Sequence, residues 1–110
     1  MARDASDLLH GTLDVLVLKT LTWGPMHGYA IAEWIGERGG GELVIVDAAL
    51  YKALHRLEDG GAIEAEWGLS DNNRRAKYYS LTARGRAQLR AETATWRRYA
   101  SAVGRILETS

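Results

Sequence analysis

The 110-residue chain is 46% hydrophobic, contains one proline and no cysteine, and balances 14 Lys and Arg against 14 Asp and Glu. This composition fits one compact globular domain, and the lack of cysteine excludes disulfide scaffolds, thiolate zinc sites and thiol nucleophiles. Residues 1–9 lack the apolar core of a signal peptide. The longest apolar stretch, residues 13–21, falls short of the ~20 residues of a membrane span. We therefore expect a cytoplasmic protein without a membrane partner.

The first predicted helix carries leucine and valine at steps of three and four between residues 9 and 21. This spacing is typical of a helix with one buried face. We expect the helix to begin at Asp7 or Gly11 and to end at Leu21. Gly24–Pro25 stops it, because the residue before a proline avoids the helical region.

Two more helices are predicted before the middle of the chain. One covers His27–Gly36 and is ended by the glycines at 39–41. A short β-prone run at 43–46 leads into the next helix. That helix starts at Asp47, a residue type suited to the N-cap position, and ends at Gly60–Gly61.

The helix that starts at Asp47 has one apolar and one polar face. Leu50, Ala53, Leu54 and Leu57 form the apolar stripe, and Ala48, Lys52, His55, Arg56 and Asp59 lie opposite. A helix can read the major groove of DNA when one face packs on its own domain and the other offers hydrogen-bond donors. The same pattern also fits an ordinary solvent-exposed face with a small excess of positive charge.

A β-hairpin is predicted next. Residues 63–67 alternate between apolar and polar, residues 76–81 are β-prone, and turn formers fill residues 70–73 between them. Arg74, Arg75 and Lys77 fall at or just after the tip of this hairpin. A cationic tip suits a phosphate backbone or a minor groove, and the alternative is a solubilising loop.

The last predicted helix is capped by Thr82 and runs to about Glu108. Gly85 in its first turn is unfavourable for a helix. Apolar residues form a stripe at helical spacing along this helix. A helix of more than ~20 residues is longer than the small domain before it can cover, so we expect its apolar stripe to pack on another chain. Trp96 in this stripe fits a dimer core, or a stacking surface for a flat ligand.

The charges are distributed unevenly along the chain. Residues 74–105 contain nine Lys or Arg and one acid, whereas residues 33–71 contain nine acids and three bases. Such asymmetry indicates a polyanionic partner, although a solvated charged helix would show it as well.

Three helices, a hairpin and a further helix predict a mainly α fold with a small β-hairpin (α+β), the winged helix-turn-helix. We expect residues 1–81 to form a DNA-binding domain and residues 82–110 a dimerisation helix. His10, His27 and His55 lack the spacing of metal ligands, and there is no phosphate-binding glycine motif or catalytic constellation. The sequence therefore predicts neither cofactor nor metal nor enzyme activity.

Three separated motifs, in the expected order, resemble PadR-type transcriptional regulators. They are residues 11–31, residues 50–61 (LYKALHRLEDGG) and residues 73–85 (NRRAKYYSLTARG). The resemblance covers roughly residues 8–90, and the single C-terminal helix is similar to the shorter subgroup of that family. It implies a homodimer that binds a palindromic site in double-stranded promoter DNA, usually as a repressor.

The helical faces, the basic hairpin tip and the resemblance together indicate which residues act. The candidate DNA-binding residues are Ala48, Ala49, Tyr51, Lys52, His55, Arg56, Arg74, Arg75 and Lys77. The candidate dimer interface, which in some members also receives a small aromatic or drug-like effector, comprises Leu9, Leu89, Trp96, Tyr99, Ala100, Val103, Ile106 and Leu107. Tyr51 would bond a phosphate through its hydroxyl, or pack against the second helix with its tip in water.

The recognition helix departs from the family pattern at three positions. Where the family often has Ser or Gly before the Leu-Tyr pair and a proline after it, this chain has Ala48, Ala49 and Lys52. One phosphate-binding hydroxyl is absent and one cation is added. The competing interpretations are a winged-helix module for protein–protein contact without DNA binding and, third, a small enzyme.

Overall fold

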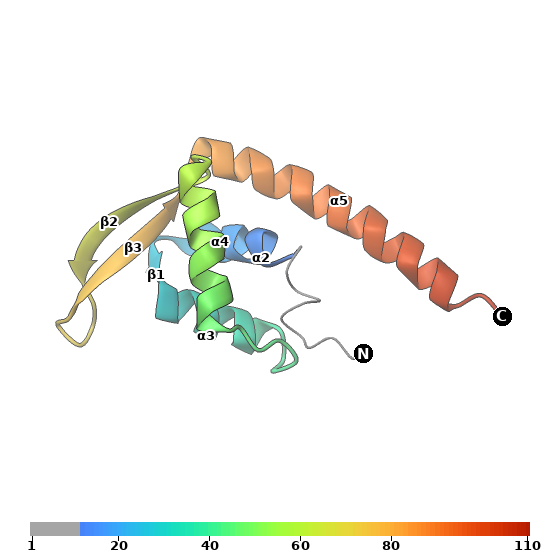
Figure 1. The fold of residues 1–110 in the computed structure, drawn as a ribbon, viewed down its shortest axis with the longest axis horizontal. Helices are drawn as coiled ribbons and strands as arrows, with labels where there is room; N and C mark the ends of the chain where they lie inside the picture. Colours follow the sequence, from blue (N-terminus) through green and yellow to red (C-terminus); the bar gives the residue numbers. More distant parts are fainter. Residues whose placement is uncertain (1–11) are drawn as a thin grey trace.

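The computed structural model describes residues 12–110, and the predicted start of the first helix and Leu9 lie outside them. The elements are the helix α2 (Leu13–Thr20), the 3-10 helix η1 (Leu21–Trp23), the strand β1 (Met26–His27), the helices α3 (Gly28–Arg38) and α4 (Asp47–Asp59), the strands β2 (Ile63–Leu69) and β3 (Arg75–Leu81), and the helix α5 (Ala83–Leu107). The helices α2, α3 and α4 gather into a body, with the hairpin on one side and α5 as a long arm (Figure 1). This arrangement is the predicted winged helix-turn-helix, in which α4 takes the place of the recognition helix and β2–β3 that of the wing.

The hydrophobic core lies between α2, α3, α4 and the base of the sheet. The predicted apolar stripe of α4 is buried there in full. The core residues are Leu13, Val17, Leu18, Leu21, Ile31, Ile35, Leu50, Ala53, Leu54, Leu57, Ala62, Ile63 and Tyr79. Because this stripe holds α4 against the body, the opposite face of the helix is left for other contacts.

The sheet has three antiparallel strands in the order β1-β3-β2. The predicted hairpin forms with Ile63 opposite Leu81 and Leu69 opposite Arg75. The strand β1 was not predicted: its two residues pair with Tyr79 and Tyr78 of β3. Two residues are too few for an alternating pattern to reveal a strand.

The predicted helix starts and ends agree with the structure to within one or two residues: α4 starts at Asp47 as predicted, and α2 ends at Thr20 where Leu21 was expected. Asp47 is not the N-cap of α4 but its first residue, where a carboxylate interacts favourably with the helix dipole. His27 precedes α3 as its N-cap and accepts a hydrogen bond from the Ala30 amide at its Nδ1, at 3.2 Å. The helix α3 then continues to Arg38, two residues beyond the predicted end. The β-prone run at 43–46 is not a strand.

The start of α5 is tied closely to the connection between α4 and β2. Thr82 is the predicted N-cap, and its hydroxyl accepts from the Gly85 amide at 3.0 Å. The same hydroxyl donates to the carbonyl of Gly61 at 2.7 Å, with the Ala62 carbonyl at 2.9 Å also in range. Gly85 is buried, and a side chain there would overlap the Ala62 carbonyl oxygen.

The helix α5 projects from the body, and the longest dimension of the molecule is 56 Å (Figure 1). Leu89, near its base, packs against the core of its own chain, and Ala100 is partly buried. Further out the apolar stripe is exposed, and it comprises Trp96, Tyr99, Val103, Ile106 and Leu107. None of the helices within residues 12–110 combines the length and the apolar character that crossing a membrane requires.

Candidate nucleic-acid interface

The exposed face of α4 spans from an edge beside the wing to an edge beside α2. Tyr51 and His55 lie at the wing edge, where they line a cleft. Lys52 points outward, one turn before Arg56. Arg56 lies at the opposite edge, because its guanidinium bonds to Asp14 of α2.

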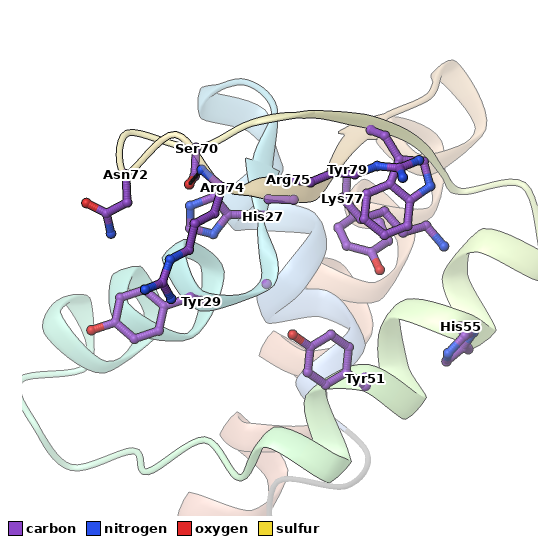
Figure 2. A pocket seen from close by; sticks show the side chains of 13 residues that line it. His27, Tyr29, Tyr51, His55, Ser70, Asn72, Arg74, Arg75, Lys77 and Tyr79 are labelled. Carbon is purple, nitrogen blue, oxygen red and sulfur yellow. Dashed lines mark hydrogen bonds between the residues drawn. The ribbon is translucent and has the colours of Figure 1, made fainter.

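A cleft of about 690 Å³ separates α4 from the wing. Figure 2 shows Tyr51 and His55 of α4 on one wall, wing side chains on the other, and His27 and Tyr29 from the start of α3. The lining residues are His27, Gly28, Tyr29, Tyr51, His55, Trp67, Ser70, Asn72, Arg74, Arg75, Ala76, Lys77 and Tyr79. Three of them are cations and none is an acid, so the cleft is suited to a polyanion.

Tyr51 reaches the cleft because the start of α3 leaves it room. A side chain at Gly28 would come within 3.0 Å of the Tyr51 hydroxyl. The ring therefore packs against α3 while the residue stays 48% exposed. In this position Tyr51 can both pack on α3 and bond a phosphate, because one side of its ring packs and its hydroxyl faces the cleft (Figure 2).

The wing tip is a tight turn that presents its arginines. The Asn73 amide donates to the Ser70 carbonyl and the Ser70 amide donates to the Arg74 carbonyl, both at 2.8 Å. Asn73 has a φ of 59°, a left-handed conformation that asparagine tolerates better than most residues. Arg74 is exposed, and the guanidinium carbon of Arg75 lies 4.6 Å from the ring centre of Trp67. This cation–π contact limits the conformations of Arg75 without removing its charge.

Lys77 is more restrained than the two arginines. Its ammonium lies 3.4 Å from a carboxylate oxygen of Glu58 on α4 and 5.7 Å from the ring centre of Tyr79. Burial raises the pKa of the Tyr79 hydroxyl, against the opposing effect of the Lys77 charge. Glu58 neutralises part of the charge that Lys77 brings to the cleft.

The structure groups the predicted DNA-binding residues into three sets. Tyr51, His55, Arg74, Arg75 and Lys77 meet in the cleft. On the outward face of α4, Ala48 and Lys52 are exposed, whereas Ala49 is partly buried against the core. Arg56 is turned toward α2 and away from the cleft.

Two strongly exposed aromatic residues of the cleft were not predicted as site residues from the sequence. Tyr29 is 73% exposed at the start of α3, and Trp67 is 57% exposed on the wing. Both belong to apolar patterns, which normally indicate burial. Their exposure depends on how α3 meets the wing, and no local pattern shows this.

A partly buried carboxyl, that of Glu92 on α5, lies near Asp14 of the α2–α4 ion pair. Within the described residues, Glu92 Oε2 of α5 is buried without a hydrogen-bond partner. Burial raises the pKa of Glu92, a hydrogen bond with Gln88 offsets part of this effect, and the charge of Asp14 adds to it. Ionised Glu92 is therefore unfavourable in the folded chain.

Replacing Glu92 by glutamine should stabilise the protein in a pH-dependent manner. Because the folded pKa lies above the unfolded one, stability is lost as the pH rises through this range, and the loss is complete at neutral pH. We expect E92Q to melt a few degrees higher than the unmodified protein at neutral pH, with the difference fading in acid. Thermal unfolding followed by circular dichroism at pH values on both sides of the carboxyl range measures this. An equal difference at every pH would show that the carboxyl charge is not responsible.

No three His, Cys, Asp or Glu side chains within residues 12–110 converge in a way that could hold a metal ion. An exposed recognition helix beside a cationic wing is instead the geometry of a DNA-binding winged helix. The class of protein is thus a winged helix-turn-helix regulator.

Comparison with known proteins identifies the family. A model of the PadR-like family of transcriptional regulators matches residues 17–91, more than half of the chain. An uncharacterized protein of Lysinibacillus sphaericus is 36% identical over 92 residues, which are 83% of this chain and 84% of the relative. The chain belongs to the PadR-like family, as the three sequence motifs indicated, and is a transcriptional regulator rather than an enzyme.

Solved structures agree with this assignment. A PadR family regulator from Eggerthella lenta is 35% identical, with a TM-score of 0.78 over 94% of this chain and 88% of its own. A transcriptional regulator from Clostridium thermocellum is 26% identical, with a TM-score of 0.84 over 93% of this chain and 99% of its own. The similarity extends beyond the winged helix and includes α5.

Proposed function

We propose that this regulator is a homodimeric repressor that binds a palindromic promoter site in the cytoplasm. The observation that carries the proposal is the cleft between α4 and the wing, with three cations and no acid in its lining. The outward face of α4 enters the major groove, and the wing arginines contact the adjacent backbone. The DNA-contacting set comprises Ala48, Ala49, Tyr51, Lys52, His55, Arg74, Arg75 and Lys77, and Arg56 joins it once it leaves Asp14.

The dimer forms through α5, residues 82–110 acting as the dimerisation segment. Trp96, Tyr99, Val103, Ile106 and Leu107 are exposed on one side of this arm, and a long apolar stripe on a projecting helix is stabilised by packing on a second copy. A two-fold axis then sets two recognition helices about 34 Å apart, one turn of DNA, which matches a palindromic site.

A small aromatic effector would bind at the same interface. The rings of Trp96 and Tyr99 lie 6.2 Å apart at an angle of 39°, both exposed in the single chain. Such a pair offers faces on which a flat ligand can stack. A ligand there would change the separation of the recognition helices and release the DNA.

Removing the wing charges tests the proposal. We expect Arg74→Ala/Arg75→Ala to bind upstream promoter DNA roughly ten- to a hundredfold more weakly. The slope of log affinity against log salt should fall by about 0.9 for each phosphate that is no longer neutralised, or about 3.6 for four arginines in a dimer. Gel-shift titrations at several salt concentrations measure both quantities.

A matched control removes the same charge from the outer face of α5. Arg98→Ala/Arg105→Ala should keep nearly the full affinity and slope. If the unmodified protein bound promoter DNA no more strongly than a random-sequence duplex, this would contradict the proposal and favour a winged-helix module for protein–protein contact.

A further inference from the structure

One cation of the helix α4, Arg56, already forms an ion pair within the chain. Nη2 of Arg56 lies 2.7 Å from Oδ1 of Asp14, which belongs to the first turn of α2. This distance is that of a charge-assisted hydrogen bond. A carboxylate on the body of the protein therefore accepts a hydrogen bond that the Arg56 guanidinium could otherwise donate to a phosphate oxygen.

The pair is placed so that it can be exchanged. The side chain of Arg56 is 45% exposed and that of Asp14 is 24% exposed. Ion pairs in such surroundings contribute little to stability, because water screens them. Arg56 also lies one turn after the outward-pointing Lys52 on α4. A phosphate that Lys52 attracts is near enough to compete for the guanidinium.

We propose that Asp14 is an intramolecular competitor of DNA phosphate for Arg56, so that DNA binding requires the exchange of this ion pair. The inference rests on the proposed DNA-binding function and assigns a regulatory role to the Asp14–Arg56 ion pair at that same site. In the unbound protein Asp14 neutralises Arg56, and non-specific binding to a duplex does not break this ion pair. Only a complex that places a phosphate beside α4 lets the Arg56 guanidinium exchange Asp14 for that phosphate.

The test is a double-mutant cycle on DNA affinity. Asp14→Asn frees Arg56, so we expect roughly two- to fivefold tighter binding to promoter DNA and a salt slope steeper by about 0.9 per protomer. In the Arg56→Ala background the same Asp14→Asn change should give no gain. Fluorescence anisotropy with labelled promoter and random duplexes at several salt concentrations provides all four affinities.

Glu37→Gln is the matched control, since it removes one negative charge from the exposed surface of α3. It should leave both affinity and slope nearly unchanged. Circular dichroism checks the fold of every variant, and Asp14→Ser replaces Asp14→Asn if the latter unfolds.

Three outcomes would overturn the inference: Asp14→Asn binds equally or more weakly, its gain persists without Arg56, or Glu37→Gln gives the same gain. These results differ from failure of the proposed function itself. In that case the unmodified protein would show no salt-dependent binding to DNA.

Discussion

Gly85→Ala is expected to destabilise the fold by about 3 kcal/mol or more. A side chain at this position would overlap the carbonyl oxygen of Ala62 and crowd the Leu81 side chain. The carbonyl is backbone and cannot rotate away as a flexible side chain would. The first turn of α5 would have to shift, and the Thr82 hydroxyl would then lose its contacts with the Gly61 and Ala62 carbonyls of the α4–β2 connection.

Urea unfolding followed by circular dichroism measures the loss as a lower midpoint. Gly36→Ala is the control, because a side chain there would meet only the Leu43 carbonyl, at 4.0 Å. Alanine favours a helix interior by about 1 kcal/mol over glycine, so this variant should be slightly more stable. An unchanged midpoint for Gly85→Ala would refute the close approach of α5 to Ala62.

The elements that could be predicted from the sequence are those with a local signal. The stripe from Leu50 to Leu57 repeats at helical spacing, and all four of its members are buried. Thr82 caps α5 as expected, because an N-cap needs only its own side chain and an amide three residues on. The wing arginines were also predictable, since the turn at residues 70–73 fixes their place in the hairpin.

What could not be predicted depends on packing between distant segments. Arg56 and Asp14 are 42 residues apart, and their pairing follows from the way α2 lies beside α4. Helical spacing places Arg56 on the polar face of its helix but does not say toward which edge its side chain turns. Gly85 similarly looks unfavourable in a helix, and only the nearby Ala62 carbonyl explains it.

The second large effect concerns the arm. We expect Val103→Glu/Ile106→Glu to be monomeric at micromolar concentration, because a dimer would bury four carboxylates, two from each protomer, between its α5 helices. Affinity for a full palindromic site should fall by about a hundredfold or more, since the two half-sites are no longer bound by linked domains. Affinity for a single half-site should change little. Sedimentation velocity gives the oligomeric state, and anisotropy with both duplexes gives the affinities.

Comparing the two duplexes separates loss of the dimer from a general electrostatic effect. Added carboxylates also repel DNA, but repulsion alone would weaken both duplexes to a similar degree. Ala94→Glu/Ser101→Glu adds the same charge on the opposite side of α5, where both residues are exposed, and it should remain dimeric with nearly full affinity. A dimeric Val103→Glu/Ile106→Glu protein would mean that the exposed stripe of α5 is not the interface, and the spacing of the recognition helices would then have to be set by another surface.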